Sequence, residues 1–233
     1  MHILVLEGDH VEAEFREKFG AAHDYQFIKI HNYTSEEYYS LIENINNAAL
    51  KADVAFCFSD PTHYSNIYQM LPPVDYPVFV EMLSDSLSDI HRENQLGPRK
   101  GTFINFCGLP TLINRSLLEV SLYHEADREQ LAETCAALGT DYRIVADRVG
   151  LVTPRVICQI INEAYYTVQE GTASRADVDL GMKLGTNYPH GPFAWANAIG
   201  ITRVYAVLEA LWQDTHDERY KVCPLLKREA LRG

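Results

Sequence analysis

The strongest constraint on the fold is a change of pattern at Asp147. Before this residue, short apolar runs alternate with helix-forming segments, and after it the pattern is helical to the end of the chain. The predicted strands are 3–6, 25–30, 53–58, 76–82, 103–106, 117–122 and 142–146, and the predicted helices among them are 11–19, 34–50 and 125–138. We therefore expect an α/β domain with a mainly parallel sheet over residues 1–146 and an all-α domain over residues 147–233.

Composition and charge exclude several classes of protein. A chain with 47% hydrophobic and 22% charged residues can bury a globular core, and no apolar run approaches the roughly 18 residues of a membrane span. The apolar start is too short and uncharged for a signal peptide, so we expect a cytoplasmic protein. A net charge of -12 argues against nucleic acid and anionic membranes as partners. Five widely spaced cysteines without a CxxC motif predict neither disulfides nor a metal site.

The first predicted turn bears on nucleotide binding. In a dinucleotide-binding fold, a GxGxxG turn lets the backbone approach a pyrophosphate at a helix N-terminus. Here the turn reads GDHVEA from Gly8, so only the first glycine is present. Side chains at His10 and Ala13 would crowd the turn, and Asp9 and Glu12 would repel a pyrophosphate, although both acids also suit a helix N-terminus as dipole partners. The fingerprint is degenerate, and the fold alone does not carry function.

The helical part of the chain has clear start and stop signals. Pro154 suits the first turn of a helix with an apolar stripe. Ser174, with Asp177 three residues later, caps a second helix that we expect to end at Gly185. The remaining helices follow a tight loop at 187–193, and two of them occupy 201–212 and 224–231. A helical domain of this size would expose apolar surface by itself. We therefore expect this surface to be buried in a homodimer or against the first domain.

These segments resemble the C-terminal domain of 3-hydroxyacyl-CoA dehydrogenases. The matching stretches are GLVTPR at 150–155, NEA at 162–164, ASRADVDLGMKLGTNYPHGPF at 173–193 and PLLKREALRG at 224–233. In the first domain the resemblance is weaker, and that domain looks shortened between Ile30 and Asp53.

The resemblance implies a two-domain NAD enzyme of fatty acid metabolism, with a Rossmann-like first domain and a dimer formed through the C-terminal helices. Such an enzyme oxidises the 3-hydroxyl of an acyl-CoA by hydride transfer to the nicotinamide, in the cleft between its domains. The reaction needs a base for the hydroxyl proton, a carboxylate that orients the base, and donors for the substrate oxygens. The family uses a His–Glu pair, with a serine and an asparagine nearby.

The family's catalytic positions can be aligned with this sequence in two registers, and neither register places a histidine at the position of the base. In the first, the positions fall on Ser84, Asn105 and Glu119; in the second, which needs no insertion, they fall on Ser86, Cys107 and Glu119. In both, the second domain's asparagine is replaced by Pro154. An asparagine side chain accepts no proton near neutral pH, and Cys107 is more typical of a buried thiol than of a base.

Other residues are candidates for ligand contacts. His190, in the YPHGPF loop, is the best alternative histidine, and Gly8 with His10 is the candidate nucleotide contact. For the phosphates of CoA, the candidates in the matched region are Arg155 and Lys183, with Arg99 and Lys100 as a second choice.

The residues favour a diverged, non-catalytic relative that binds an acyl-CoA thioester or a protein partner in the cleft. Two alternatives stay open. One is an active short-form 3-hydroxybutyryl-CoA dehydrogenase with NAD and an unrecognised base. The other is a structural dimerisation module.

Overall fold

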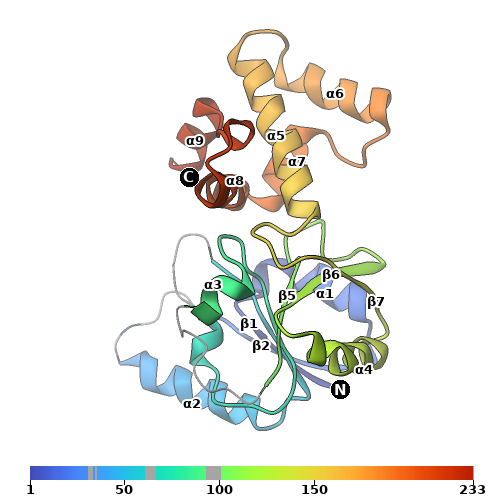
Figure 1. The fold of residues 1–233 in the computed structure, drawn as a ribbon, viewed down its shortest axis with the longest axis vertical. Helices are drawn as coiled ribbons and strands as arrows, with labels where there is room; N and C mark the ends of the chain where they lie inside the picture. The colour runs from blue at the N-terminus through green and yellow to red at the C-terminus, as the bar shows by residue number, and fades with distance from the viewer. Residues whose placement is uncertain (31–33, 35, 61–66, 93–100, 233) are drawn as a thin grey trace.

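The computed structural model describes residues 1–30, 34, 36–60, 67–92 and 101–232, which form two domains (Figure 1). The described part of the N-terminal domain contains one sheet in the order β2-β1-β3-β4-β5-β6-β7. Its strands are β1 (His2–Leu6), β2 (Asp24–Ile28), β3 (Val54–Cys57), β4 (Val78–Val80), β5 (Phe103–Phe106), β6 (Leu117–Leu122) and β7 (Asp141–Ile144). Neighbouring strands are parallel except β5 and β6, which confirms the mainly parallel sheet.

The one antiparallel pair follows from a short connection. Residues 107–116 join β5 to β6. A parallel crossover needs about a dozen residues or more, usually with a helix, so the chain reverses direction here instead. The reversal places the start of β6 beside the end of β5, at the edge of the sheet that faces the second domain (Figure 1).

Helices cover both faces of the sheet, and the central strands β3 and β4 are continuous apolar runs. On one face lie α1 (Glu12–Phe19) and α4 (Arg128–Leu138), and on the other lie α2 (Glu37–Ala49) and α3 (Leu87–Arg92). Phe56 of β3 stacks on Phe79 of β4 with ring centroids 4.6 Å apart, and Phe15 of α1 meets Phe56 edge to face at 4.9 Å. Packed aromatic rings therefore form the centre of the first face.

The C-terminal domain is a group of helices around α5 (Thr153–Gln169). The buried side of α5 packs against α7 (Pro192–Ile199), α8 (Ile201–Thr215) and α9 (Pro224–Ala230), which together form one apolar core. The remaining long helix, α6 (Arg175–Thr186), contributes no buried residue to this core and lies at the end of the molecule far from the sheet (Figure 1).

The cap predicted at Ser174 forms, and Thr34 forms a similar one with Glu37. The backbone N–H of Glu37 donates to Thr34 Oγ1 at 3.3 Å, and that of Asp177 donates to Ser174 Oγ at 3.2 Å. These local signals explain why α2 and α6 begin where the sequence places them.

The end of α6 and the presence of α3 differ from the sequence prediction. The prediction that the second helix ends at Gly185 is wrong, because α6 continues to Thr186 and ends where Asn187 takes a left-handed conformation (φ 56°). Asparagine tolerates this conformation, so it replaces glycine as the stop. The short helix α3 was not predicted, and its N-terminus is capped both locally, by Ser86 with Asp89, and by Asp147 from a distant part of the chain.

The start of α7 offers a test of the helical packing. Asp179 of α6 accepts hydrogen bonds from the backbone N–H groups of Phe193 (2.7 Å) and Ala194 (3.0 Å). A Cβ on Gly191 would lie 2.4 Å from Asp179 Cβ, so Gly191→Ala should displace this cap and lower the free energy of unfolding by about 2 kcal/mol. At Gly181, inside α6, a Cβ would meet nothing within 4 Å. Gly181→Ala should therefore raise the free energy of unfolding by about 0.5–1 kcal/mol. Urea unfolding measures both changes, and equal stability of the two variants would contradict this role of the cap.

Candidate functional site

A cavity of about 540 Å³ lies where the two domains meet, outside the carboxyl ends of β3 and β4. From the sheet domain it is lined by Cys57, Phe58, Ser59, Asp60, Ile67, Tyr68, Val80, Glu81, Met82, Leu83, Ser84, Asp85 and Ile90. From the helical domain it is lined by Thr202, Tyr205, Ala206, Glu209, Ala210, Gln213, Ala230 and Leu231. Open α/β sheets bind ligands at this edge, and the volume is typical of small-molecule sites. The cavity is therefore the candidate functional site.

The turn after β1 does not fit a dinucleotide. Glu7, not Gly8, takes the left-handed conformation of the tight turn (φ 56°), so the predicted register of the fingerprint is wrong by one residue. In the corrected register, Glu7, Asp9 and Glu12 stand where the fingerprint has its three glycines. Three acids around the place of a pyrophosphate oppose its binding. The residues present therefore do not fit the NAD that the family implies.

His10 packs inside the protein instead of facing the cavity. Its ring meets the edge of Phe58 with centroids 5.6 Å apart. Burial, together with the nearby guanidinium of Arg203 on α8, lowers the pKa of His10 to about 4, so the ring is neutral near pH 7. Gly8 is required by close packing, since a Cβ there would lie 2.4 Å from Val5 Cγ1. Neither Gly8 nor His10 is among the residues that line the cavity.

The buried carboxylate of Glu119 holds the start of the helical domain. Its Oε1 accepts hydrogen bonds from the backbone N–H groups of Val152 (2.5 Å) and Thr153 (3.1 Å). Its Oε2 accepts from Thr153 Oγ1 (2.5 Å), and Arg115 Nη2 lies 3.9 Å away. Because the first N–H groups of a helix have no partner within the helix, this carboxylate supplies the acceptor that α5 needs. Glu119 thus acts as a helix cap between the domains.

Of the second register, Cys107 lines a small closed gap, whereas Ser86 and Glu119 are not among the residues that line it. Cys107 follows β5, and its backbone N–H donates to the carbonyl oxygen of Glu119 at 3.0 Å. With Pro154, Cys107 lines a gap of only about 10 Å³ whose other walls include Leu83 and Leu151. Such a volume holds about one water molecule. Burial raises the pKa of the Cys107 thiol to about 12, so the thiol carries its proton at neutral pH and is no base.

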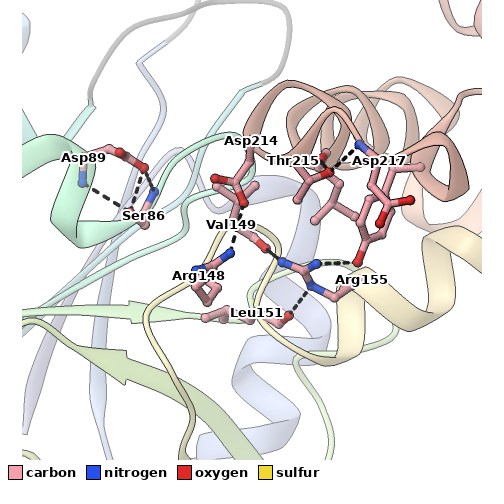
Figure 2. Close-up of polar contacts among 11 residues, drawn as sticks. Ser86, Asp89, Arg148, Val149, Leu151, Arg155, Asp214, Thr215 and Asp217 are labelled. Carbon is pink, nitrogen blue, oxygen red and sulfur yellow. Dashed lines mark hydrogen bonds and ion pairs between the residues drawn. The ribbon is translucent and has the colours of Figure 1, made fainter.

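In the first register, the side chains of Ser84 and Asn105 do not meet at one point. Asn105 lies fully buried on β5, where its Oδ1 accepts from the backbone N–H of Met82 at 3.3 Å. Ser84 lines the cavity and donates to the carboxylate of the next residue at 2.8 Å. Ser86 caps the start of α3, where its Oγ donates to Asp89 at 2.7 Å (Figure 2). Of the predicted serines, only Ser84 belongs to the described cavity wall.

The linker between the domains is tied to both of them. Asp147 accepts hydrogen bonds from the backbone N–H groups of Leu87 (3.0 Å) and Ser88 (2.8 Å), at the start of α3. The next residue, Arg148, pairs with Asp214 of α8 at 3.7 Å, as Figure 2 shows. One linker dipeptide therefore contacts the sheet domain and the helical domain.

Arg155 is part of the same linker structure. Its guanidinium donates to the carbonyl oxygens of Val149 (2.7 Å) and Leu151 (3.3 Å) and to Tyr220 Oη (2.6 Å) (Figure 2). All three nitrogens are used, so the geometry gives this side chain a structural role and offers little for the phosphates of CoA.

The other predicted contacts lie away from the cavity. Lys183 is exposed on α6, and the ring of His190 packs near Trp195 with centroids 5.7 Å apart. Neither residue is among those that line the cavity. Arg99 and Lys100 lie outside the described residues. A role for any of these side chains in binding stays a prediction.

Sequence reasoning missed Glu81 and Arg203. Glu81 follows β4 directly, is 4% exposed and keeps one carboxylate oxygen without a partner. Its signal was an acid at the carboxyl end of a buried strand, the position where α/β proteins place functional groups. Arg203 had no such signal, because only the docking of α8 brings it near Glu81 and His10.

Two further searches of the described residues found nothing. No group of three or more His, Cys, Asp or Glu side chains there could hold a metal ion. None of the helices in that part of the chain is both long and apolar enough to cross a membrane.

Comparisons with known proteins identify relatives of this chain. Residues 150–233 match the model of the 3-hydroxyacyl-CoA dehydrogenase C-terminal domain. The chain is 44% identical over 87 residues to 3-hydroxyadipyl-CoA dehydrogenase of Escherichia coli. That match covers 37% of this chain and 18% of that protein. It is 33% identical over 102 residues to 3-hydroxybutyryl-CoA dehydrogenase of Bradyrhizobium diazoefficiens. That match covers 44% of this chain and 35% of that protein. The matches thus span about a third or less of these relatives.

A solved structure extends the comparison to the whole fold. (S)-3-hydroxybutyryl-CoA dehydrogenase from Ralstonia eutropha aligns with a TM-score of 0.69 over 100% of this chain and 94% of that chain. Its sequence identity of 19% supports likeness of fold alone. The fold is accordingly a Rossmann-like domain followed by a helical domain. Residues 150–233, the C-terminal domain of this chain, therefore belong to the family of 3-hydroxyacyl-CoA dehydrogenase C-terminal domains.

Proposed function

We propose that this chain is a 3-hydroxyacyl-CoA dehydrogenase-like protein that does not catalyse the family's oxidation and instead binds a small organic molecule in the interdomain cavity. The observation that carries the proposal is a contrast of volumes. The gap at Cys107 and Pro154 has about 10 Å³, whereas the cavity beside it has about 540 Å³. Space for a ligand has been kept, while space at the catalytic position has been filled.

The chemistry of the carried-over positions supports the loss of catalysis. A positioned general base typically contributes about 10²–10⁴ in rate. The amide of Asn105 cannot serve, the thiol of Cys107 has a pKa of about 12, and the carboxylate of Glu119 is occupied as a helix cap. The alternative, an active short-form 3-hydroxybutyryl-CoA dehydrogenase, requires a base elsewhere on the cavity wall.

An acyl-CoA thioester is the first ligand to test, because the family name implies it and apolar side chains such as Met82, Leu83 and Ala210 line the cavity. The CoA phosphates would have to remain outside, since neither Arg155 nor Lys183 lines it. A purely structural dimerisation module needs no such cavity, so the open volume favours a binding function.

A turnover assay and a thermal-shift assay test this function together. We expect NADH absorbance to stay constant with acetoacetyl-CoA between about pH 6 and about pH 9, because this reduction needs an acid that donates the hydroxyl proton, and neither the Asn105 amide nor the Cys107 thiol exchanges a proton in that range. A ligand of the cavity at about 100 times its Kd should stabilise the protein by about 2.7 kcal/mol, whereas NAD and NADH should not. Turnover of NADH would instead support the active short form.

A second test addresses the closed gap. Cys107→His restores the family's base in the second register, but the ring does not fit a gap of about 10 Å³. We expect it to lower the free energy of unfolding by about 1–3 kcal/mol and to give no dehydrogenase activity. Cys107→Ser, which keeps the side-chain volume, is the control. A Cys107→His protein as stable as the wild type, with measurable NADH oxidation, would contradict the closed gap.

We also propose that the chain forms a homodimer through α6. This helix contributes no buried residue to its own domain, and Leu180 and Leu184, one turn apart, are 57% and 78% exposed. Apolar side chains at i and i+4 lie on the same face of a helix. An exposed apolar face of this kind is typical of an interface between subunits.

The dimer is tested by charging this face. Leu184→Glu should convert the dimer to a monomer in size-exclusion chromatography with light scattering, because a carboxylate buried in an apolar interface lacks a partner. Leu50→Glu is a matched control, since Leu50 is 84% exposed at the end of α2, on the other domain. A wild-type monomer, or dissociation by both variants alike, would count against the α6 interface.

A further inference from the structure

We infer that Ser59 and Glu81 form a nucleophile–base pair with which the interdomain cavity hydrolyses a short, activated acyl group, that is, an ester or a thioester. The inference rests on the proposed binding of a small molecule in the cavity and adds a reaction to it. This reaction differs in class from the family's oxidation, because it breaks an acyl bond with water and transfers no hydride.

The hydroxyl of Ser59 and the carboxylate of Glu81 are in direct contact. Ser59 lies just after β3 and Glu81 just after β4, so the two residues come from the carboxyl ends of neighbouring parallel strands. Ser59 Oγ donates to Glu81 Oε2 at 3.0 Å. A nucleophile and the base that activates it are typically about 2.6–3.2 Å apart. Both residues also line the cavity, so the pair lies where a bound ligand would be.

The surroundings of the two side chains suit these roles. Glu81 is 4% exposed, whereas Ser59 is partly exposed at the cavity. The backbone N–H of Ser59 donates to the same Oε2 at 3.2 Å, so the carboxylate is held in one orientation beside the hydroxyl. Burial raises the pKa of Glu81, although the nearby guanidinium of Arg203 opposes this effect. A carboxylate with a raised pKa binds a proton more strongly and is a better base.

A comparison with the other serine of the cavity wall supports the assignment. Ser59 and Ser84 are the serines among the described residues that line the cavity. The hydroxyl of Ser84 also donates to a carboxylate, but that carboxylate belongs to the adjacent, exposed Asp85. An exposed carboxylate is solvated by water, so it takes up a proton less readily than a buried one. Of the two serines, Ser59 therefore combines access from the cavity with a buried base.

The reaction takes place in two steps, in which nothing is oxidised or reduced. In the first, Ser59 Oγ attacks the carbonyl carbon of the bound acyl group, and its proton moves to Glu81 Oε2. The bond to the leaving alcohol or thiol breaks, the leaving group takes this proton from Glu81, and an acyl ester of Ser59 remains. In the second, water attacks that ester, Glu81 takes a proton from the water and returns it to Ser59 Oγ, and the carboxylic acid leaves.

The turn after Glu81 offers donors for the substrate's carbonyl oxygen. The backbone N–H groups of Ser84 and Asp85 donate to no acceptor in the part of the chain that the structure describes, and both residues line the cavity. During the attack, negative charge develops on the carbonyl oxygen, and backbone N–H groups are donors that stabilise such a charge. Apolar side chains such as Leu83 and Ile90 complete the wall and would cover a short acyl chain.

Two acyl donors with the same acyl group and different leaving groups test the inference: p-nitrophenyl butyrate, an ester, and butyryl-CoA, a thioester. Each is incubated with the full chain at about pH 8, where the release of p-nitrophenol or of the CoA thiol is followed by absorbance. Mass spectrometry of the acid-stopped reaction then looks for a butyryl group on Ser59. We expect release of the leaving group from at least one donor, with transient butyrylation of Ser59.

The outcomes separate this inference from the proposed binding function. Release from one donor alone, with the adduct, supports the inference and identifies the leaving group as an alcohol or a thiol. Absence of both release and adduct overturns the inference, whereas stabilisation of the protein by butyryl-CoA in a thermal-shift assay would still support binding. Absence of release, adduct and stabilisation counts against both.

Substitutions test the two roles. Ser59→Ala removes the nucleophile and Glu81→Gln removes the base with little change of shape, so each should lower the rate of release at least about 100-fold. Ser59→Cys should restore acylation, because a thiol is also a nucleophile. Ser116→Ala, at an exposed serine outside the cavity wall, is the matched control and should leave the rate unchanged. Urea unfolding checks that each variant is folded, and a folded Ser59→Ala protein with the wild-type rate would contradict the inference.

The pH dependence of the rate distinguishes a base from a merely structural carboxylate. Glu81 accepts a proton only when it is ionised, and burial raises its pKa, so the rate should rise with pH until the carboxylate is ionised and then level off. The charged and titratable groups around Glu81 are Arg203 on α8 and Cys107 after β5. The guanidinium keeps its charge and the thiol has a pKa of about 12, so neither group changes its charge between about pH 5 and about pH 9. In Glu81→Gln, after subtraction of the reaction without protein, the residual rate should lose this dependence, and retention of the wild-type profile would contradict the assignment.

Discussion

The hydrogen bonds between the Glu119 carboxylate and the first turn of α5 connect the two halves of this protein. They satisfy N–H groups that the helix itself leaves without partners, and they do so from a buried strand of the sheet. Asp147 and Arg148 reinforce the junction from the linker, one toward α3 and the other toward α8. These contacts, together with apolar packing of Leu109 and Leu112 against the helical core, hold the two domains next to each other and so shape the cavity between them.

The same contacts bear on the proposed loss of catalysis. In the second register, the positions of the family's base, carboxylate and asparagine are occupied by Cys107, Glu119 and Pro154. A small buried thiol and a proline let the domains approach until about 10 Å³ remains between them, and the carboxylate is free to cap a helix because there is no imidazole to orient. The open volume lies instead next to the ends of β3 and β4, where the wall is acidic.

Part of the site was predictable and part was not. Strand ends are visible in the sequence, and of the residues predicted near them, Ser84 lies in the cavity wall while Cys107 and Glu119 do not. The hydrogen-bond partners of these residues were not visible. A glutamate such as Glu119 looks the same in the sequence whether its carboxylate orients a base or caps a helix. Arg203 and Asp147 act on residues far away in the chain, and no local pattern encodes such contacts.

The sequence by itself determined the α/β character of the first domain, the helical second domain, the capped start of α6, and the family of the C-terminal domain, because all of these depend on local periodicity, capping chemistry or a contiguous motif. Only the tertiary structure decided which side chains face one another across the domain junction. That is where the gap at Cys107 closes, where the turn at Glu7 excludes a pyrophosphate, and where four carboxylates meet in one cavity. Burial and charge at a site are sums over segments that are distant in the chain, so they exist only once the chain has folded.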